Sequence, residues 1–360
     1  MNIAIIQPIV PVYREDFFQS LQKCTNTDVF VFKDPNKVRK EQSKISTFKV
    51  RHLPNLSLKG FQFYNPLPLL SGKYDVLVLM MQFNHITTLL LLLFKTILRK
   101  KVILWGHGIS VKRYLQEEKK PDWKLKWMIQ HADGCWVYMD KEYQQWRGIF
   151  PQKPIIALNN TISGAEAITK MDVWSEKGKL KLKYNIKQER VIIFCARFSN
   201  PYRRTDILLE VIQGVNPQNV GFIIIGDGEY KPDFGKYNHV YDYGTVYDNN
   251  VKNELFCIAD IYFQPGWVGL SIVEAMAYAK PIFTFRRTPK TYQCVEYSYI
   301  FEGENGLIFD KVEDCVNSIQ NLKDSDIIEM GKSARKLVQS QLTPDKMSLN
   351  AYQVLKEVLA

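Results

Sequence analysis

The sequence predicts an α/β protein built from two parallel-sheet domains. Apolar segments of strand type alternate with segments of helical spacing, and the alternation breaks at a turn-rich stretch near residues 151–163 before it restarts. A chain of 360 residues with 46% hydrophobic content can bury two ordinary cores. We therefore expect domains at residues 1–160 and 161–345, and a last helix at 346–360 that packs back on the first domain.

The first half alternates strands and helices in order. The expected strands are Ile3 to Gln7, Asp28 to Phe32, Tyr74 to Met81, Lys101 to Trp105 and Gly134 to Met139, and the expected helices are Phe17 to Cys24 and His85 to Leu98. Continuous apolar strands of this kind are typical of sheets that are covered on both faces. A further helix carries Tyr143 and Trp146, and Asp140 is placed to cap it.

The second half repeats this pattern. The expected strands are Val191 to Cys195, Val220 to Ile225, His239 to Tyr243, Asp260 to Phe263, Pro281 to Phe285 and Gly306 to Phe309. The expected helices are Asp206 to Ile212, Asn249 to Ile258, one that begins near Leu270, Val312 to Leu322, Asp324 to Gln341 and Met347 to Leu359. Ligands of such folds bind beyond the carboxyl ends of the strands, so residues that follow the strands are the site candidates.

Composition narrows the class of protein. The cysteines are scattered without metal-ligand spacing, which indicates reduced core residues of a cytosolic protein, and they are Cys24, Cys135, Cys195, Cys257, Cys294 and Cys315. The start of the chain lacks the features of a signal peptide, and the longest apolar run, Ile86 to Phe94, is too short to span a bilayer.

A net charge of +11 predicts a negative partner: nucleic acid, an anionic membrane or phosphorylated substrates. No nucleic-acid-binding module is recognisable, so that partner ranks last.

The stretch from Ile261 to Ile282 is an apolar strand, a turn with two glycines and a segment of helical spacing. Ser271 lies at the expected helix start, where a hydroxyl can cap, and the backbone from Val268 to Ile272 is a possible seat for a phosphate. Glu274 lies one turn inside, where a carboxylate can accept hydrogen bonds from ribose hydroxyls. An ordinary crossover, in which Glu274 only stabilises the first turn, fits these residues equally well.

Two loops that follow strands carry further candidates. Arg197 and Arg203 come directly after the Val191 strand, and guanidinium groups there could grip a diphosphate. A basic, solvated loop is the alternative. Gly226 and Gly228 flank Asp227 after the next strand and allow close backbone approach, although such triplets are common turns.

In the first half, His107 lies between two glycines at the end of a buried strand, and Arg113 follows it closely. His107 could hydrogen-bond a sugar hydroxyl or a phosphate. Pro11, Tyr13 and Arg14 belong to the first strand-to-helix loop. This loop either contacts an acceptor or is a rigid surface loop, and the residues leave both readings open.

Two segments suggest a membrane surface. The run Leu89 to Leu93 is followed by several basic residues, and Lys119 to Met128 interleaves tryptophan with lysine as interfacial helices do. A pure leucine run is more often a buried crossover helix, so the second segment has the greater weight. Together with the basic charge it predicts peripheral attachment and a lipid-linked acceptor.

The stretch around Glu274 resembles the donor-binding signature of the family-4 glycosyltransferases (glycosyltransferase group 1), which have the GT-B fold. Gly269, Leu270 and Glu274 match its Gly-Leu and its second glutamate, and Val268 takes the place of a phenylalanine. The first glutamate of the family's pair is replaced by Gly266. The resemblance covers almost the whole chain and is strongest from Val191 to Asp310.

The other candidates match the family as well. Arg197 corresponds to the family's arginine and Arg203 to its lysine, while Arg204 stands where a glycine is usual. The resemblance implies that the backbone near Val246 reads the base edge and that His107 approaches the donor sugar. With Gly266 in place of glutamate, it implies that backbone amides hold the sugar and that catalysis runs through stabilisation of the phosphate.

The resemblance implies a GT-B protein of two Rossmann-like domains with a deep interdomain cleft. It further implies a hexosyltransferase (EC 2.4 type) that moves a sugar from a nucleotide diphosphate sugar, with retention of the anomer, to a lipid-linked saccharide of polysaccharide, capsule or glycolipid biosynthesis. We expect a cytoplasmic enzyme, peripheral on the inner face of the plasma membrane, without a cofactor or a required metal. The alternatives are a nucleotide-sugar epimerase, which Gly266 disfavours, and a non-catalytic subunit that binds nucleotide sugars.

The expected site residues fall into three groups. The catalytic group is His107, Arg197 and Arg203. The nucleotide-sugar-binding group is Gly226, Gly228, Val246, Gly266, Val268, Gly269, Leu270, Ser271 and Glu274. The acceptor-side group is Pro11, Tyr13, Arg14 and Arg113.

Overall fold

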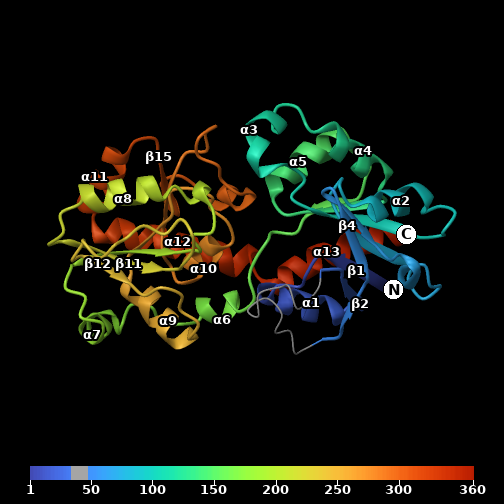
Figure 1. The fold of residues 1–360 in the computed structure, drawn as a ribbon. Helices are drawn as coiled ribbons and strands as arrows, with labels where there is room; N and C mark the ends of the chain where they lie inside the picture. Colours follow the sequence, from blue (N-terminus) through green and yellow to red (C-terminus); the bar gives the residue numbers. More distant parts are fainter. Residues whose placement is uncertain (34–47) are drawn as a thin grey trace. The chain divides into compact units, whose positions relative to one another are not determined.

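A computed structural model describes residues 1–33 and 48–360 of the chain. It divides into two compact units, here called unit 1 (Met1–Gly164 with Thr343–Ala360) and unit 2 (Ala165–Leu342). These bounds lie a few residues from the boundaries expected at residues 160 and 345. Figure 1 shows the elements of both units, with labels on part of them. No helix of the described residues combines the length and the apolar character that crossing a membrane requires.

Unit 1 is organised around a seven-stranded sheet of order β3-β2-β1-β6-β7-β8-β9, in which all neighbouring strands are parallel. Its strands are β1 (Asn2–Gln7), β2 (Asn26–Val31), β3 (Val50–His52), β6 (Val76–Met80), β7 (Lys101–Gly106), β8 (Gly134–Val137) and β9 (Ile155–Ala157). The central strands are almost fully buried, as their continuous apolar runs predict. The strand β3 and a small antiparallel hairpin were not expected from the sequence.

The helices of unit 1 are α1 (Glu15–Gln22), α2 (Ile86–Phe94), α3 (Tyr114–Glu117), α4 (Trp123–His131), α5 (Asp140–Ile149) and α13 (Pro344–Leu359). The hairpin consists of β4 (Asn55–Leu58) and β5 (Phe61–Tyr64). Helix α13 packs against α1, β8 and β9. The expectation that Asp140 caps α5 is wrong, because Met139 is the capping residue and Asp140 lies inside the first turn without a capping bond.

Unit 2 contains a six-stranded parallel sheet of order β12-β11-β10-β13-β14-β15. Its strands are β10 (Arg190–Cys195), β11 (Val220–Ile225), β12 (Val240–Asp242), β13 (Ile261–Phe263), β14 (Ile282–Phe285) and β15 (Gly306–Phe309). Its helices are α6 (Ala165–Thr169), α7 (Lys177–Lys183), α8 (Thr205–Gly214), α9 (Asn249–Ile258), α10 (Ser271–Ala277), α11 (Val312–Asn321) and α12 (Asp324–Gln341).

The strand order of unit 2 reverses at β10. From β10 the chain proceeds outward to β11 and β12, and then returns to place β13 on the other side of β10. Open parallel sheets bind ligands outside the carboxyl ends of the strands at such a switch point. Residues of the loops after β10 and β13 are therefore the leading site candidates of unit 2.

Candidate functional site

The loop after β13 is held by a buried glutamine that the sequence analysis did not single out. Gln264 is fully buried, and its Nε2 donates to the carbonyl oxygens of Gly266 (3.0 Å) and Trp267 (2.7 Å). Its Oε1 accepts a hydrogen bond from the Ser271 hydroxyl (2.9 Å). Ser271 therefore ties the helix start to the strand end and makes no capping bond to α10, contrary to expectation.

A second buried glutamine holds the same loop from the other side. Gln293 accepts a hydrogen bond from the Val268 amide (2.8 Å) and donates to the carbonyl oxygen of Pro265 (3.0 Å). The expected phosphate seat from Val268 to Ile272 is therefore incomplete, because the Val268 amide is occupied by Gln293 and the Ile272 amide donates to the Gly269 carbonyl (3.1 Å).

Gly266 lies in close contact with the loop that follows β10. A Cβ atom at this position would overlap the carbonyl oxygen of Tyr202 and would lie 2.8 Å from Cγ of Arg204. The ring of Tyr202 also stacks on Trp267, with 5.1 Å between the ring centroids. The loops after β10 and β13 are thus packed together at Gly266.

Glu274 forms an ion pair that the sequence did not reveal. Its Oε1 lies 2.6 Å from Nζ of Lys252 on α9, and both side chains are mostly buried. Burial lowers the pKa of Lys252, but the charge and the hydrogen bond of Glu274 outweigh it, so the net pKa is raised. The pair therefore keeps a carboxylate and an ammonium group together close to the switch point of the sheet.

Arg203 is mostly buried after β10 and is incompletely paired. Its Nη1 donates to the carbonyl oxygen of Trp267 (2.9 Å), while its Nε is buried without a hydrogen-bond partner among the described residues. Burial lowers the pKa of the Arg203 guanidinium, and the neighbouring charge of Arg197 acts in the same direction. Arg197 itself is exposed. An acceptor atom of a ligand could satisfy this buried N–H group.

The next arginine has a structural role. Arg204 adopts a left-handed backbone conformation (φ 53°) at the start of α8. Its guanidinium binds the Asp206 carboxylate and donates from Nη1 to the hydroxyl of Thr291 (2.6 Å).

The glycines of the loop after β11 serve the packing between loops. Gly226 and Gly228 have φ angles of 142° and 145°, which side chains disfavour. A Cβ at Gly226 would overlap the carbonyl oxygen of Ala196, and one at Gly228 would lie 2.6 Å from the carbonyl oxygen of Phe198. The close backbone approach that these two glycines allow is to other backbone atoms of the protein.

The other donor-side candidates lie on the same edge of the sheet. Val246 is half-buried in the loop between β12 and α9, and Gly269 and Leu270 are half-buried directly before α10. A Cβ at Gly269 would meet no atom closer than 3.8 Å, so this glycine has room around it.

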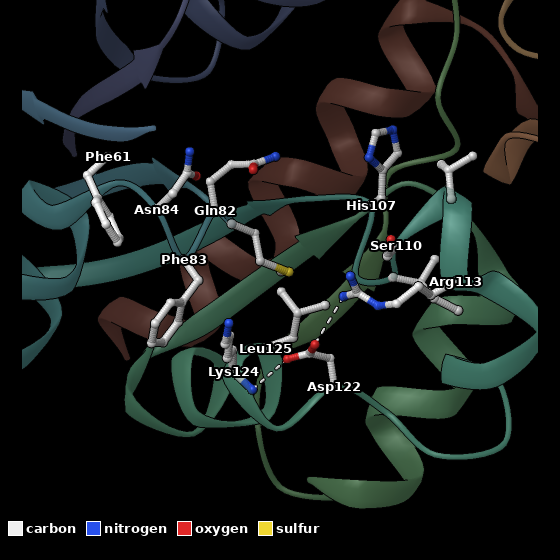
Figure 2. A pocket seen from close by; sticks show the side chains of 13 residues that line it. Phe61, Gln82, Phe83, Asn84, His107, Ser110, Arg113, Asp122, Lys124 and Leu125 are labelled. Carbon is white, nitrogen blue, oxygen red and sulfur yellow. Dashed lines mark hydrogen bonds and ion pairs between the residues drawn. The ribbon is translucent and has the colours of Figure 1, made fainter. Parts of the chain in front are cut away.

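Unit 1 has a pocket of its own, with a volume of about 460 Å³ (Figure 2). It lies beyond the carboxyl ends of β6 and β7, and His107 and Arg113 both line it. The structure thus brings together two residues that the sequence analysis placed in different groups. Polar or aromatic side chains that the sequence analysis missed as site candidates also line it: Phe61, Gln82, Phe83, Asn84, Asp122 and Lys124.

The charged groups of this unit 1 pocket differ in how they are paired. Arg113 forms ion pairs with Glu117 (2.6 Å) and Asp122 (3.1 Å). Lys124 forms no ion pair within residues 1–33 and 48–360, and its ammonium lies 5.4 Å from the ring centroid of Phe83. Lys124 is therefore the better candidate for an anionic group of a ligand.

Arg14 does not lie at a surface, and its assignment to the acceptor side needs correction. It is buried, its Nη1 donates to Sδ of Met347 (3.2 Å), and it lies 5.4 Å from the ring centroid of Trp105. Because α13 supplies Met347, Arg14 connects the first loop to the last helix within unit 1. Tyr13 is exposed. The carbonyl oxygen of Pro11 accepts a hydrogen bond from the Arg14 amide at the start of a short 3₁₀ helix.

No group of three or more His, Cys, Asp or Glu side chains within residues 1–33 and 48–360 is arranged to hold a metal ion.

Part of unit 2 matches a known family model. Residues 189–325 match the family model described as "Glycosyl transferases group 1". No curated protein sequence matches the chain.

Solved structures resemble the chain over nearly its full length. The lipopolysaccharide outer core galactosyltransferase WaaB in its apo form has a TM-score of 0.68 at 16% identity, with 99% of both chains covered. HepE of Anabaena, in complex with UDP and glucose, has a TM-score of 0.65 at 15% identity, again with 99% of both chains covered. A TarM variant of S. aureus, in complex with fondaparinux, α-GlcNAc-glycerol and UDP, has a TM-score of 0.63 at 11% identity, covering 98% of this chain and 99% of that chain.

Identities this low show a common fold, and that fold is GT-B. Residues 189–325 are thus similar to glycosyltransferases of group 1, and the chain has the GT-B fold.

Proposed function

We propose that the chain transfers a sugar from a nucleotide diphosphate sugar to a saccharide acceptor, and that unit 2 binds the donor. The observation that carries the proposal is the buried Nε of Arg203 beside the switch point of the sheet, which has no hydrogen-bond partner in the described part of the chain. A diphosphate oxygen would satisfy this donor and gain a charge-assisted hydrogen bond. The complex of the similarly folded HepE with UDP and glucose supports a donor of this class.

Three groups of unit 2 have distinct roles in this proposal. Arg197 and Arg203 offset the charge that develops on the leaving diphosphate. The Glu274 carboxylate accepts hydrogen bonds from the ribose hydroxyls, and Lys252 orients this carboxylate through the ion pair. The backbone near Val246 contacts the base.

In the transfer step, an acceptor hydroxyl oxygen forms a bond to C1 of the donor sugar while the bond from C1 to the diphosphate oxygen breaks. The hydroxyl proton passes to the leaving diphosphate, so that attack occurs on the same face and the anomeric configuration is retained. Arg197 and Arg203 supply positive charge at the leaving group, and we therefore expect no requirement for a metal.

The unit 1 pocket is the proposed acceptor site. Phe61 and Phe83 offer apolar ring faces for a sugar, and the side-chain amides of Gln82 and Asn84 offer donors and acceptors for its hydroxyls (Figure 2). His107 approaches the sugar from the end of β7. We extend the proposal to a lipid-linked acceptor of polysaccharide, capsule or glycolipid biosynthesis, reached by a cytoplasmic protein that is peripheral on the inner face of the plasma membrane.

Gly266 favours a second candidate function. It provides no carboxylate, and the packed loops around it leave no room for one. The chain could therefore bind nucleotide sugars without turnover, as the partner of an active enzyme. We prefer the transferase, because Arg197, Arg203 and Glu274 are all present on one edge of the sheet.

A panel of nucleotide sugars distinguishes the candidates. Each donor is incubated with the protein and with saccharide acceptors, with and without EDTA, and released nucleotide and glycosylated product are measured. Transfer that EDTA leaves unchanged supports the proposal. Donor binding without turnover supports the non-catalytic subunit, and an isomerised sugar supports an epimerase.

A matched pair of variants tests the role of Arg203. Arg203→Gln removes the positive charge at the leaving group and should lower kcat on the order of 100-fold. Arg286→Gln changes an exposed arginine of the same unit that is paired with Asp310, and it should have no effect. Equal activities of the two variants would contradict the assignment of Arg203 to the donor site.

A further inference from the structure

The β4–β5 hairpin of unit 1 turns its apolar face outward. The register pairs Leu58 with Phe61 and Leu56 with Phe63, so that these four side chains lie on one face. Leu56 (62% exposed), Leu58 and Phe61 are among the exposed large hydrophobic residues. The inward face carries Tyr64, which stacks on a core phenylalanine and bonds to Thr88 of α2.

Helix α2 likewise buries polar side chains and exposes apolar ones. Its buried side includes Thr87 and Thr88, which hydrogen-bond to Tyr64. Its exposed side is apolar, and a stripe with helical spacing continues beyond its last turn: Leu90, Leu93, Phe94 and Ile97 (78% exposed). A surface helix in contact only with water normally has the opposite arrangement.

The hairpin and α2 contact each other and lie over the same core of unit 1. Tyr64 of the hairpin and Leu91 and Leu92 of α2 belong to one hydrophobic cluster, together with Met128 and Ile129 of α4. Their outward residues therefore point away from the sheet on the same side. Trp123 at the start of α4 adds an exposed indole (67%) beside Phe83. We call the outward apolar residues of these three elements the apolar surface.

The segments that carry the apolar surface are strongly basic. Between residues 54 and 101 there are six Lys or Arg residues and a single acidic one, Asp75. Several exposed cations there and on the approach to α4 have no ion-pair partner within residues 1–33 and 48–360: Lys59, Arg99, Lys119, Lys120, Lys124 and Lys126. A negatively charged surface with an apolar interior would match both features.

We infer that the apolar surface docks onto an anionic lipid bilayer, with the hairpin, α2 and Trp123 inserted among the acyl chains and the lysines at the headgroups. Phe61 belongs both to this surface and to the wall of the unit 1 pocket. The pocket therefore opens beside the bilayer, where the head group of a lipid-linked saccharide can enter while its lipid remains in the membrane. This last use of the surface rests on the proposed function, but the docking does not.

Vesicle binding tests the inference with the full chain and without donor or acceptor. Cosedimentation with phosphatidylcholine vesicles that contain phosphatidylglycerol should retain the protein, and vesicles of phosphatidylcholine alone should retain much less. Raising the salt concentration should weaken the binding to anionic vesicles. Brominated lipids should quench tryptophan fluorescence, and the variant Trp123→Phe should lose most of this quenching.

Two double variants and a matched control localise the contact. Leu56→Ser with Leu58→Ser, and Leu90→Ser with Leu93→Ser, should each lower the vesicle partition coefficient on the order of tenfold or more. Leu182→Ser, at an 84% exposed leucine between two lysines on α7 of unit 2, should leave it unchanged. Thermal melting checks that each variant is folded.

Three outcomes overturn the inference: no binding to anionic vesicles, equal binding by all variants, or a dimer in solution that the hairpin and α2 variants dissociate. The last outcome assigns the apolar surface to a second copy of the chain. Transfer to a water-soluble acceptor should be unchanged in the double variants. Absence of transfer with every donor, together with normal vesicle binding, overturns the proposed function and leaves the docking surface standing.

Discussion

At Gly266 the structure leaves no room for a side chain. The carbonyl of Tyr202 and the side chain of Arg204 occupy the space that a side chain would need. Placing a glutamate here by Gly266→Glu should therefore destabilise the protein by about 1 to 3 kcal/mol without raising activity. Thermal unfolding and a transfer assay measure both effects. Gly269→Ala is the matched control in the same loop, because its Cβ has room, and an activity gain in Gly266→Glu would contradict this explanation.

The Glu274–Lys252 pair predicts a specific loss of donor affinity. Glu274→Gln keeps the shape of the side chain and removes its charge, so nucleotide diphosphate affinity, measured by calorimetry, should fall on the order of 10- to 100-fold. Lys252→Gln should weaken binding less, because the carboxylate that we propose as the acceptor of hydrogen bonds from the ribose remains. A double-mutant cycle gives the coupling of the pair. If Glu274→Gln leaves nucleotide diphosphate affinity unchanged, Glu274 does not bind the ribose hydroxyls.

Lys280 predicts a pH dependence of stability. It is fully buried between α10 and β14, donates to the carbonyl of Ala259 (2.7 Å), and burial lowers its pKa to about 8. Between about pH 8 and the unfolded value of 10.5 the unfolded state binds more protons than the folded state. Stability relative to Lys280→Met should therefore rise with pH across this window, on the order of 3 kcal/mol. Chemical denaturation of both proteins across this window measures the difference, and parallel curves would contradict it.

At the scale of elements, α13 completes unit 1. Its buried side packs on α1, β8 and β9, and Gly134 of β8 leaves room for Val354 and Val358. Leu355→Ala removes a fully buried side chain of this helix and should cost about 2 to 5 kcal/mol in the free energy of unfolding. Leu349→Ala, at an exposed position of the same helix, should cost little, and denaturant titration compares the two.

Elements differed in how well the sequence predicted them. The central strands of both sheets lie where continuous apolar runs predicted them, because parallel strands are buried on both faces. The β4–β5 hairpin was missed, since its turn places Lys59 and Gly60 at positive φ (48° and 85°) and lysine is not a typical residue there. The exposed side of α2 was also hidden, because a helix rich in leucine on every side does not indicate which side is buried.

At the scale of the whole molecule, local patterns predicted the two parallel sheets and the residues that follow their strands. They could not predict contacts between residues distant in sequence. Gln264 and Gln293 jointly hold one loop, and Lys252 on α9 reaches Glu274 on α10, yet nothing in their own segments marks them as partners. Only part of the lining of the unit 1 pocket was predicted, because Phe61 belongs to the hairpin that the sequence did not reveal.

Unit 1 is assembled from two separate stretches of chain, 1–164 and 343–360. The ribosome therefore makes all of unit 2 before it makes α13, which covers α1, β8 and β9. Domains generally fold as units in the order of their synthesis, but unit 1 is complete only after residues 343–360 have been made. Until then, the apolar flank of unit 1 that α13 covers is exposed to water.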